Sequence, residues 1–321
     1  MHKTWLWLLI FSSILTPLSQ AKQLLFERKQ SHYQYLWQDH QGQKQQLQFE
    51  LLGYPIQLTK FIQYRPKQAQ QYILNKLKPE LDKLDPKQAR VSISSSHNQF
   101  SFQIQGYDQV FIDQLVAQIN SHSDKFYQDY LQQQYFIEQT ISDSSTAIMP
   151  DHNRFAKESA KYLTSWLNSS LNAINKDPVP LREITNYLLS FVQSIPYNQL
   201  RSKDNLRGAG YLTPIQVLRN NQGDCDSKTT LLASALKYLY PRLGVAIIYV
   251  PNHALLALGI PPRANDETVN VAGKTMVLAE PTGPALYALG KVSDSSAQAI
   301  RSGIYSYQRM DWVPPKFKRE K

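Results

Sequence analysis

The chain has 321 residues, of which 42% are hydrophobic and 19% charged, and its formal net charge is +10. This composition excludes a disordered or fibrous protein and provides enough apolar residues for two modest globular cores. The single cysteine excludes an intramolecular disulfide, so packing must stabilise the fold. The basic residues are spread along the chain, which is typical of a solvated basic surface or of contact with an anionic cell-envelope component.

The first 21 residues are typical of a secretory signal peptide. His2 and Lys3 precede an apolar run from Trp5 to Leu15, and cleavage is expected after Ala21. The apolar run is too short for a membrane span, and no later segment is long enough for one. We therefore expect a periplasmic or secreted protein with no transmembrane anchor in the mature chain and no nucleic-acid partner.

Residues 22–142 are predicted to form a small α+β module, in the order strand, strand, helix, strand, strand, helix. The expected elements are Tyr33–Trp37, Gln45–Leu51, Ala69–Leu84, Arg90–Ser94, Phe100–Ile104 and Val110–Tyr135. Pro79 predicts a kink or break in the first of the two helices. Aromatic residues of the first hairpin are expected in the core. The module has no candidate nucleophile, so it is interpreted as a prodomain, a substrate-recruiting module or a partner-docking module, with recruiting or docking favoured.

Residues 143–310 are predicted to form the catalytic domain. The small polar segment 141–147 is the expected boundary. Beyond it, Asp151 or Asn153 is expected to cap a helix that runs to about Ile174, and the apolar spacing of Leu181–Ser194 predicts a second helix. Residues 311–321 form a basic C-terminal tail, interpreted as a frayed terminus.

The only cysteine, Cys225, lies at the start of a predicted helix that runs to about Tyr240. Thr213-Pro214 is a capping signal for a short helix before it. The unpaired N–H groups and the macrodipole of a helix N-terminus favour an anion, so we expect the pKa of the Cys225 thiol to lie below its ordinary value. Three predicted strands follow the helix, at Val245–Val250, His253–Leu258 and Lys274–Glu280.

A thiol, a histidine and a carboxylate thus follow one another along the chain. Thiol attack on an acyl carbon needs a base that takes the proton and returns it to the leaving group, and that base needs an orienting acceptor. Cys225, His253 and Glu280 are predicted to fill these roles in that order. The backbone N–H of Cys225 and the side chain of Gln222 are candidate oxyanion donors. No metal or other cofactor is expected, because the remaining histidines of the mature chain show no ligand spacing: His32, His40, His97, His122 and His152.

These motifs together resemble the bacterial transglutaminase-like superfamily, over about residues 151–284. The resemblance is carried by Thr213-Pro214, Gly223-Asp-Cys-Asp-Ser-Lys228, Asn252-His-Ala254 and Glu280-Pro-Thr282. It implies a papain-like α+β fold, in which a helix bears the nucleophile Cys225 and a small antiparallel sheet bears the base His253. The family usually has an aspartate where this chain has Glu280, and often an aromatic residue where this chain has Leu255.

The resulting hypothesis is an exported cysteine hydrolase, a protease or amidase, that cleaves an amide bond through a thioester. Its expected substrate is a protein or peptide, with a component of the cell envelope as one candidate. A first alternative is a protein cross-linking acyl transferase that uses the same triad, with an amine in place of water. A second alternative is a non-catalytic binding or assembly protein on the same fold.

Overall fold

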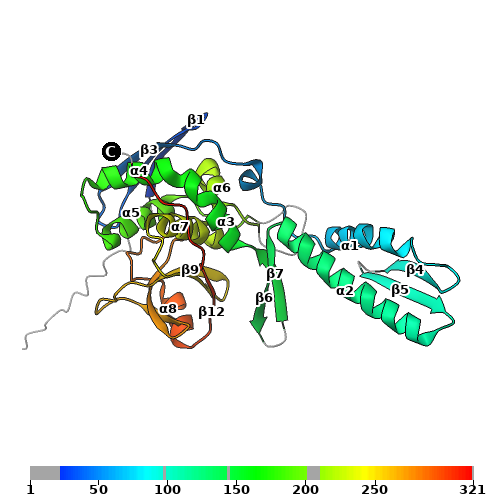
Figure 1. The fold of residues 1–321 in the computed structure, drawn as a ribbon. Coiled ribbons are helices and arrows are strands. Elements are labelled where there is room, and N and C mark those ends of the chain that lie inside the picture. Colours follow the sequence, from blue (N-terminus) through cyan, green and yellow to red (C-terminus); the bar gives the residue numbers. More distant parts are fainter. Residues whose placement is uncertain (1–21, 97–98, 143–144, 201–209, 320–321) are drawn as a thin grey trace, which may run out of the picture.

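The computed structural model describes residues 22–96, 99–142, 145–200 and 210–319. The expected signal peptide, residues 1–21, lies outside them. The fold is mixed α and β and consists of a body, built from residues 22–59 and 151–319, and an arm, built from residues 60–150, that projects from it (Figure 1). Among the described residues, none of the helices is both long and apolar enough to cross a membrane.

The body begins with an antiparallel sheet of β1 (Lys22–Lys29), β2 (His32–Gln38) and β3 (Lys44–Glu50). Because side chains alternate along a strand, Tyr33, Tyr35 and Trp37 of β2 all face inward, and each is at most 2% exposed. The prediction that the aromatics of this hairpin are core is confirmed. The Trp37 indole lies edge-on to Phe191, at 5.2 Å between centroids, and donates a hydrogen bond to Ser190 Oγ at 3.1 Å.

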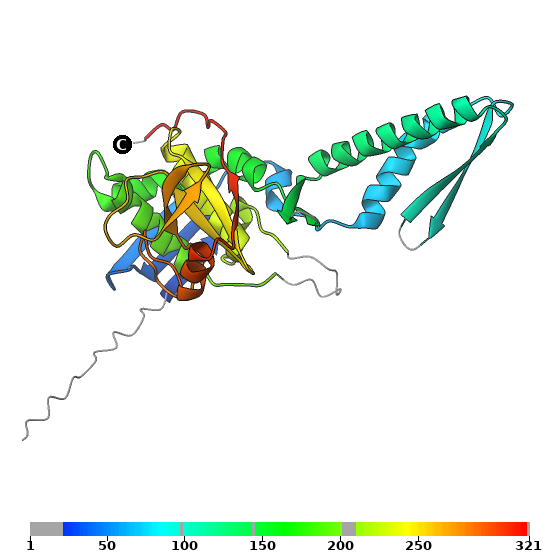
Figure 2. The same cartoon turned by 90° about the horizontal axis from the view of Figure 1, so that it is seen from below.

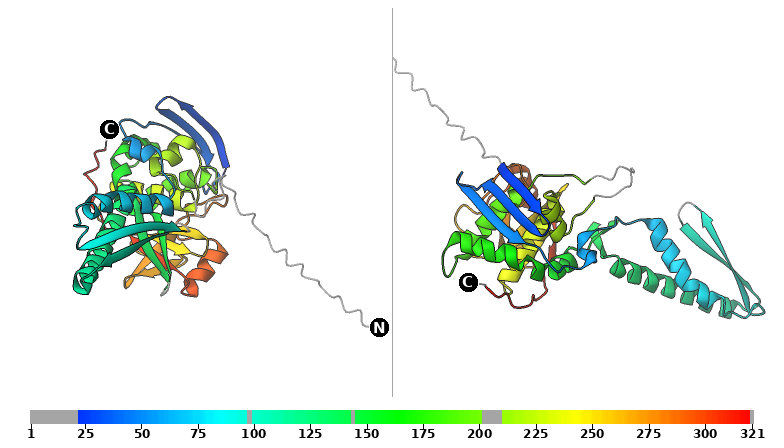
Figure 3. Two further views of the ribbon diagram at one scale, coloured as in Figure 1. Left: turned by 90° about the vertical axis from the view of Figure 1, so that its right-hand side faces the viewer. Right: turned by 90° about the horizontal axis from the view of Figure 1, so that it is seen from above.

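This packing does not follow the expected boundary at residue 142. The inward face of the first sheet shares one hydrophobic core with helices from beyond residue 151, α4 (Thr164–Ile174) and α5 (Leu181–Ser194). Figure 3 shows the sheet lying against the body, far from the tip of the arm. The expected module 22–142 is therefore divided, because the aromatic face of β2 is buried against α5 and not against the helices of the arm.

The arm consists of α1 (Pro66–Leu81), α2 (Gln109–Gln133) and two hairpins. The first hairpin, β4 (Ala89–Ser96) with β5 (Gln99–Gly106), packs on both helices around Leu77, Leu115 and Ile119. Helix α1 continues past Pro79 and ends two residues later. The second hairpin, β6 (Phe136–Ser142) with β7 (Ser145–Pro150), includes the segment that was expected to be a linker.

The second half of the body places helices on both faces of an antiparallel sheet. An expected single helix is interrupted: α3 (His152–Ser159), capped by Asp151, is joined to α4 by the 3-10 turn η2 (Ala160–Leu163). The sheet has the order β10-β11-β9-β8-β12. Its strands are β8 (Val245–Val250), β9 (His253–Leu258), β10 (Thr268–Val271), β11 (Lys274–Ala279) and β12 (Ser306–Arg309).

Helix α7 (Cys225–Leu239) covers one face of this sheet and α8 (Asp294–Arg301) covers the other (Figures 1 and 2). Along β9, Ala254 and Leu256 belong to the core shared with α7, whereas Leu255 and Ala257 belong to the core beneath α8. Helix α6 (Pro214–Asn220) precedes α7 and opens with the expected Thr213 cap. The two faces of β9 decide which side of the sheet each candidate site residue occupies.

Candidate active site

Cys225 is the first residue of α7, as predicted. Asp224 caps the helix, because its Oδ1 accepts a hydrogen bond from the Ser227 backbone N–H at 2.9 Å. The turn before the cap is held by the segment that follows α5: the Gly223 N–H donates to the Pro196 carbonyl at 3.2 Å, and the Gly223 carbonyl accepts from the Asn198 N–H at 3.1 Å. These contacts fix the backbone from which the thiol projects.

The surroundings of the thiol disfavour the thiolate. Burial raises the pKa of Cys225, and the carboxylates of Asp226 and Asp224 raise it further, while a backbone hydrogen bond from Ala254 opposes them. The Sγ atom lies 3.5 Å from Asp226 Oδ1. The expectation of a lowered pKa is therefore wrong. Desolvation and two adjacent negative charges outweigh the helix N-terminus, and the resting thiol is protonated.

His253 and Glu280 are brought together by neighbouring strands. His253 is the first residue of β9 and Glu280 follows the last residue of β11, and these strands pair in the sheet. The His253 Nε2 lies 3.1 Å from Glu280 Oε1, and Glu280 Oε2 accepts the Ser293 N–H at 2.7 Å. An ionised carboxylate only accepts hydrogen bonds, so Nε2 carries the proton and Nδ1 of a neutral ring is free to act as a base.

The histidine and the glutamate lie on the α8 side of the sheet. They line a cavity of about 340 Å³ together with Val250, Ser293 and Ala299. The side chain of His253 is 21% exposed and that of Glu280 is 6% exposed. The carboxylate is thus shielded from water while the imidazole remains accessible. This suits a Glu280 carboxylate that orients the ring and a His253 imidazole that transfers protons.

The structure brings Cys225 close to the β9 backbone but does not join it to the imidazole. The thiol contacts the backbone of Ala254, the residue that follows His253 in β9. Ala254 faces α7, whereas His253 lies on the α8 side at the very start of the strand. Within the described part of the chain, no hydrogen bond links the thiol to the His253 ring. Proton transfer between them requires the thiol and the imidazole to come within hydrogen-bond distance.

Gln222 is held by a neighbouring loop. Its Oε1 accepts a hydrogen bond from Asn198 Nδ2 at 2.9 Å. Gln222 stands three residues before Cys225, in the turn that α5 and its following residues support. Its role as an oxyanion donor stays a prediction.

Three buried or half-buried polar side chains on or beside the first turns of α7 were not assigned roles from the sequence. His152 is fully buried and its pKa is lowered by burial, and its Nδ1 lies 3.0 Å from Thr230 Oγ1 on α7. Tyr249, on β8, lies near the thiol and is half-buried. Lys228, one turn after Cys225, is fully buried, donates from Nζ to the Ile195 carbonyl, and has its pKa lowered to about 7 by burial. Of these three residues, only Lys228 could have been singled out from the sequence, because it is a basic residue within the motif that contains Cys225.

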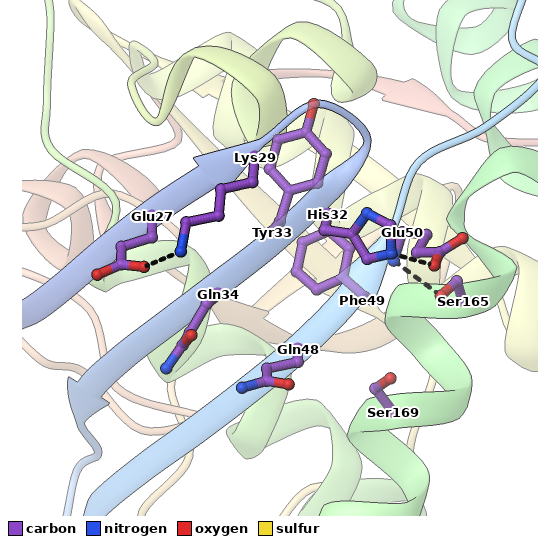
Figure 4. Close-up of a pocket in the computed structure, with 10 residues that line it drawn as sticks. All are labelled: Glu27, Lys29, His32, Tyr33, Gln34, Gln48, Phe49, Glu50, Ser165 and Ser169. Carbon is purple, nitrogen blue, oxygen red and sulfur yellow. Dashed lines mark hydrogen bonds and ion pairs between the residues drawn. The ribbon is translucent and has the colours of Figure 1, made fainter.

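A second cavity, of about 370 Å³, lies on the first sheet and is independent of Cys225 (Figure 4). Polar side chains line it, among them Gln34, Gln48 and Ser169. His32 Nε2 and Glu50 Oε1, at its edge, are 2.6 Å apart. No group of three or more histidine, cysteine, aspartate or glutamate residues within the described ranges could hold a metal ion. The absence of a metal or other cofactor stays a prediction.

A comparison of the chain with models of known protein families, with curated proteins and with solved structures found no match.

Proposed function

We propose that the protein is an exported cysteine hydrolase of the transglutaminase-like type, with a papain-like catalytic domain, that cleaves an amide bond in a protein or peptide. The observation that carries the proposal is the hydrogen-bonded series Ser293, Glu280 and His253, which ends one residue from the backbone that contacts the Cys225 thiol. A buried carboxylate that orients an accessible imidazole next to a thiol at a helix N-terminus is the arrangement that thiol acyl chemistry needs.

The chemistry follows from the protonation states. Because the resting thiol is protonated, His253 Nδ1 takes the Sγ proton as sulfur bonds to the acyl carbon. The imidazolium, stabilised by Glu280, then gives this proton to the leaving amine as the carbon–nitrogen bond breaks and the thioester remains. Water, deprotonated by the same imidazole, adds to the thioester and releases the acid and the free thiol.

The alternative of an acyl transferase differs only in the last step, where an amine attacks the thioester in place of water. The alternative of a binding or assembly protein has a specific observation in its favour: the thiol is hydrogen-bonded to Asp226 and not to His253. One experiment separates the three.

The experiment incubates the mature protein with a fraction of exported proteins and a labelled primary amine. New protein termini without label support the hydrolase, and label incorporation without hydrolysis supports the transferase. Either product is expected to fall by about a thousandfold or more in Cys225→Ala and His253→Ala. Ser234→Ala is a matched control on the same helix, because Ser234 is buried and its hydroxyl donates to the Ala156 carbonyl, at 2.6 Å. Products that survive in Cys225→Ala would refute both enzymatic functions.

A further inference from the structure

Gln193, on α5, links the first sheet of the body to the backbone of Glu280. It is 1% exposed. Its Nε2 donates hydrogen bonds to the carbonyl of Glu280, at 2.8 Å, and to the carbonyl of Tyr287, at 2.9 Å. Its Oε1 lies 3.0 Å from Nε2 of His40, in the turn between β2 and β3. The amide therefore spans two segments that are 240 residues apart in the sequence.

The donors and acceptors of this link match in only one orientation. Two carbonyl oxygens can be satisfied only by the NH₂ group of Gln193, so its Oε1 must face His40. Nε2 of His40 must then carry a proton. Burial lowers the pKa of His40 by more than its contacts with Gln193 and the Tyr287 backbone raise it, which favours a neutral ring. The turn that holds His40 is itself fixed, because Asp39 Oδ1 accepts the Gln41 and Gln43 backbone N–H groups, each at 2.9 Å.

The clamped segment is the one that carries the orienting carboxylate. Glu280 stands just past the end of β11, beyond Ala279, the last residue of β11 that pairs with β9, and strand ends open most readily. Gln193 fixes its carbonyl, so that the side chain on the same Cα meets His253 and the Ser293 N–H. A second clamp lies further along, where Asn186 Oδ1 accepts the Leu289 N–H at 2.7 Å.

We propose that Gln193, oriented by His40, is a positioning residue that holds Glu280 against His253. The inference rests on the proposed function for its importance to catalysis, but the hydrogen bonds it concerns exist whether or not Cys225 is a nucleophile. The first sheet of the body then serves the active site directly, because its β2–β3 turn supplies the donor that orients the amide.

The test measures the imidazole Nε2–H of His253 by NMR in ring-¹⁵N-histidine protein, assigned with His253→Ala. In Gln193→Met, which keeps the volume but loses the three hydrogen bonds, exchange of this proton with water is expected to be about tenfold faster, the factor that corresponds to one ordinary hydrogen bond. His40→Leu is expected to act in the same direction. His40→Gln retains a donor at the position of Nε2 and should restore slow exchange.

Ser190→Ala is the matched control for a general loss of stability. Ser190 is buried on the same helix, accepts the Trp37 indole N–H and donates to the Tyr187 carbonyl, so its hydroxyl hydrogen bonds in the described structure involve neither Glu280 nor Tyr287. In Ser190→Ala, the His253 Nε2–H should exchange with water at the wild-type rate. An unchanged rate in Gln193→Met, an equal acceleration in Ser190→Ala, or a wild-type protein without a slowly exchanging His253 signal would each overturn the inference. None of these exchange rates depends on Cys225, so the two failures can be told apart. If only the proposed function fails, exchange of the His253 proton is still faster in Gln193→Met, but no Cys225-dependent product forms.

Discussion

Replacing Asp226 with asparagine removes the carboxylate that contacts the Cys225 thiol while keeping the shape of the side chain. Sγ and Oδ1 are 3.5 Å apart. At about 4 Å, two unit charges repel each other by about 1 kcal/mol in water and by about 4 kcal/mol at the effective dielectric constant of about 20 that suits a protein site. Asp226→Asn should therefore raise the thiolate fraction of Cys225 at neutral pH by between about fivefold and about a thousandfold.

The measured rate of alkylation should rise by less than the thiolate fraction. A thiolate of lower pKa is a weaker nucleophile, with a Brønsted slope of about 0.4–0.5, so the alkylation rate should increase by about twofold to about fortyfold. The assay is the pseudo-first-order labelling of Cys225 by iodoacetamide, followed by intact mass. Glu183→Gln is the control, because Glu183 is an acidic residue in the first turn of another helix, α5, and its loss has a similar effect on the helix dipole.

The sign of the change decides the outcome. Labelling in Asp226→Asn that is as slow as in the wild type, or slower, would refute the explanation that this carboxylate keeps the thiol protonated. An equal acceleration in Glu183→Gln would attribute the change to loosening of the fold and not to the local charge.

Three further results are expected. In Glu280→Gln, a single carbonyl oxygen replaces the two carboxylate oxygens that meet His253 Nε2 and the Ser293 N–H, so only one of these hydrogen bonds is kept. Any Cys225-dependent rate of product formation should fall by about two to four orders of magnitude in the folded variant. An unchanged rate would exclude an orienting role of Glu280 toward His253. The pKa of Lys228 is about 7 in the folded chain and about 10.5 when unfolded, so the unfolded state binds more protons between these two pH values. From pH 7 to about 8.5, the unfolding free energy of the wild type in urea should therefore rise relative to that of Lys228→Met. Parallel curves of unfolding free energy against pH would contradict the burial of a neutral amine. Trp37→Ala should lower the unfolding free energy, measured in urea, by about 3–5 kcal/mol. Tyr107 is fully exposed, and Tyr107→Ala should lower it by at most about 0.5 kcal/mol. Equal losses would show that the first sheet is not part of the core.

Local signals predicted the elements around Cys225 closely. Pro196 and the apolar spacing placed α5, the Thr213-Pro214 cap placed α6, and the β-branched run from Val245 placed β8. Each depends on residues within one helix or strand. The hairpin β6–β7 was missed because the small polar residues of its two strands resemble a linker, although Ser142 pairs with Ser145 and Thr140 with Thr146.

Features that depend on distant residues could not be predicted in this way. The alternation in β2 predicted a buried aromatic face, but nothing local indicates that Phe191 of α5 covers it. The helix start at Cys225 was visible, whereas the burial of the thiol and the approach of Asp226, which reverse the direction of its pKa shift, are properties of the assembled fold. The link from His40 through Gln193 to Glu280 likewise joins three elements that only packing brings together.

The most direct test of the proposed function is to trap the acyl-enzyme. The mature protein is mixed with exported proteins, quenched in acid, digested and analysed by mass spectrometry for the peptide that contains Cys225. The proposal predicts an acyl adduct on Cys225 that hydroxylamine removes, and much less of it in His253→Ala. Amide cleavage or amine transfer that proceeds with no adduct on Cys225, and at the same rate in Cys225→Ala, would contradict it.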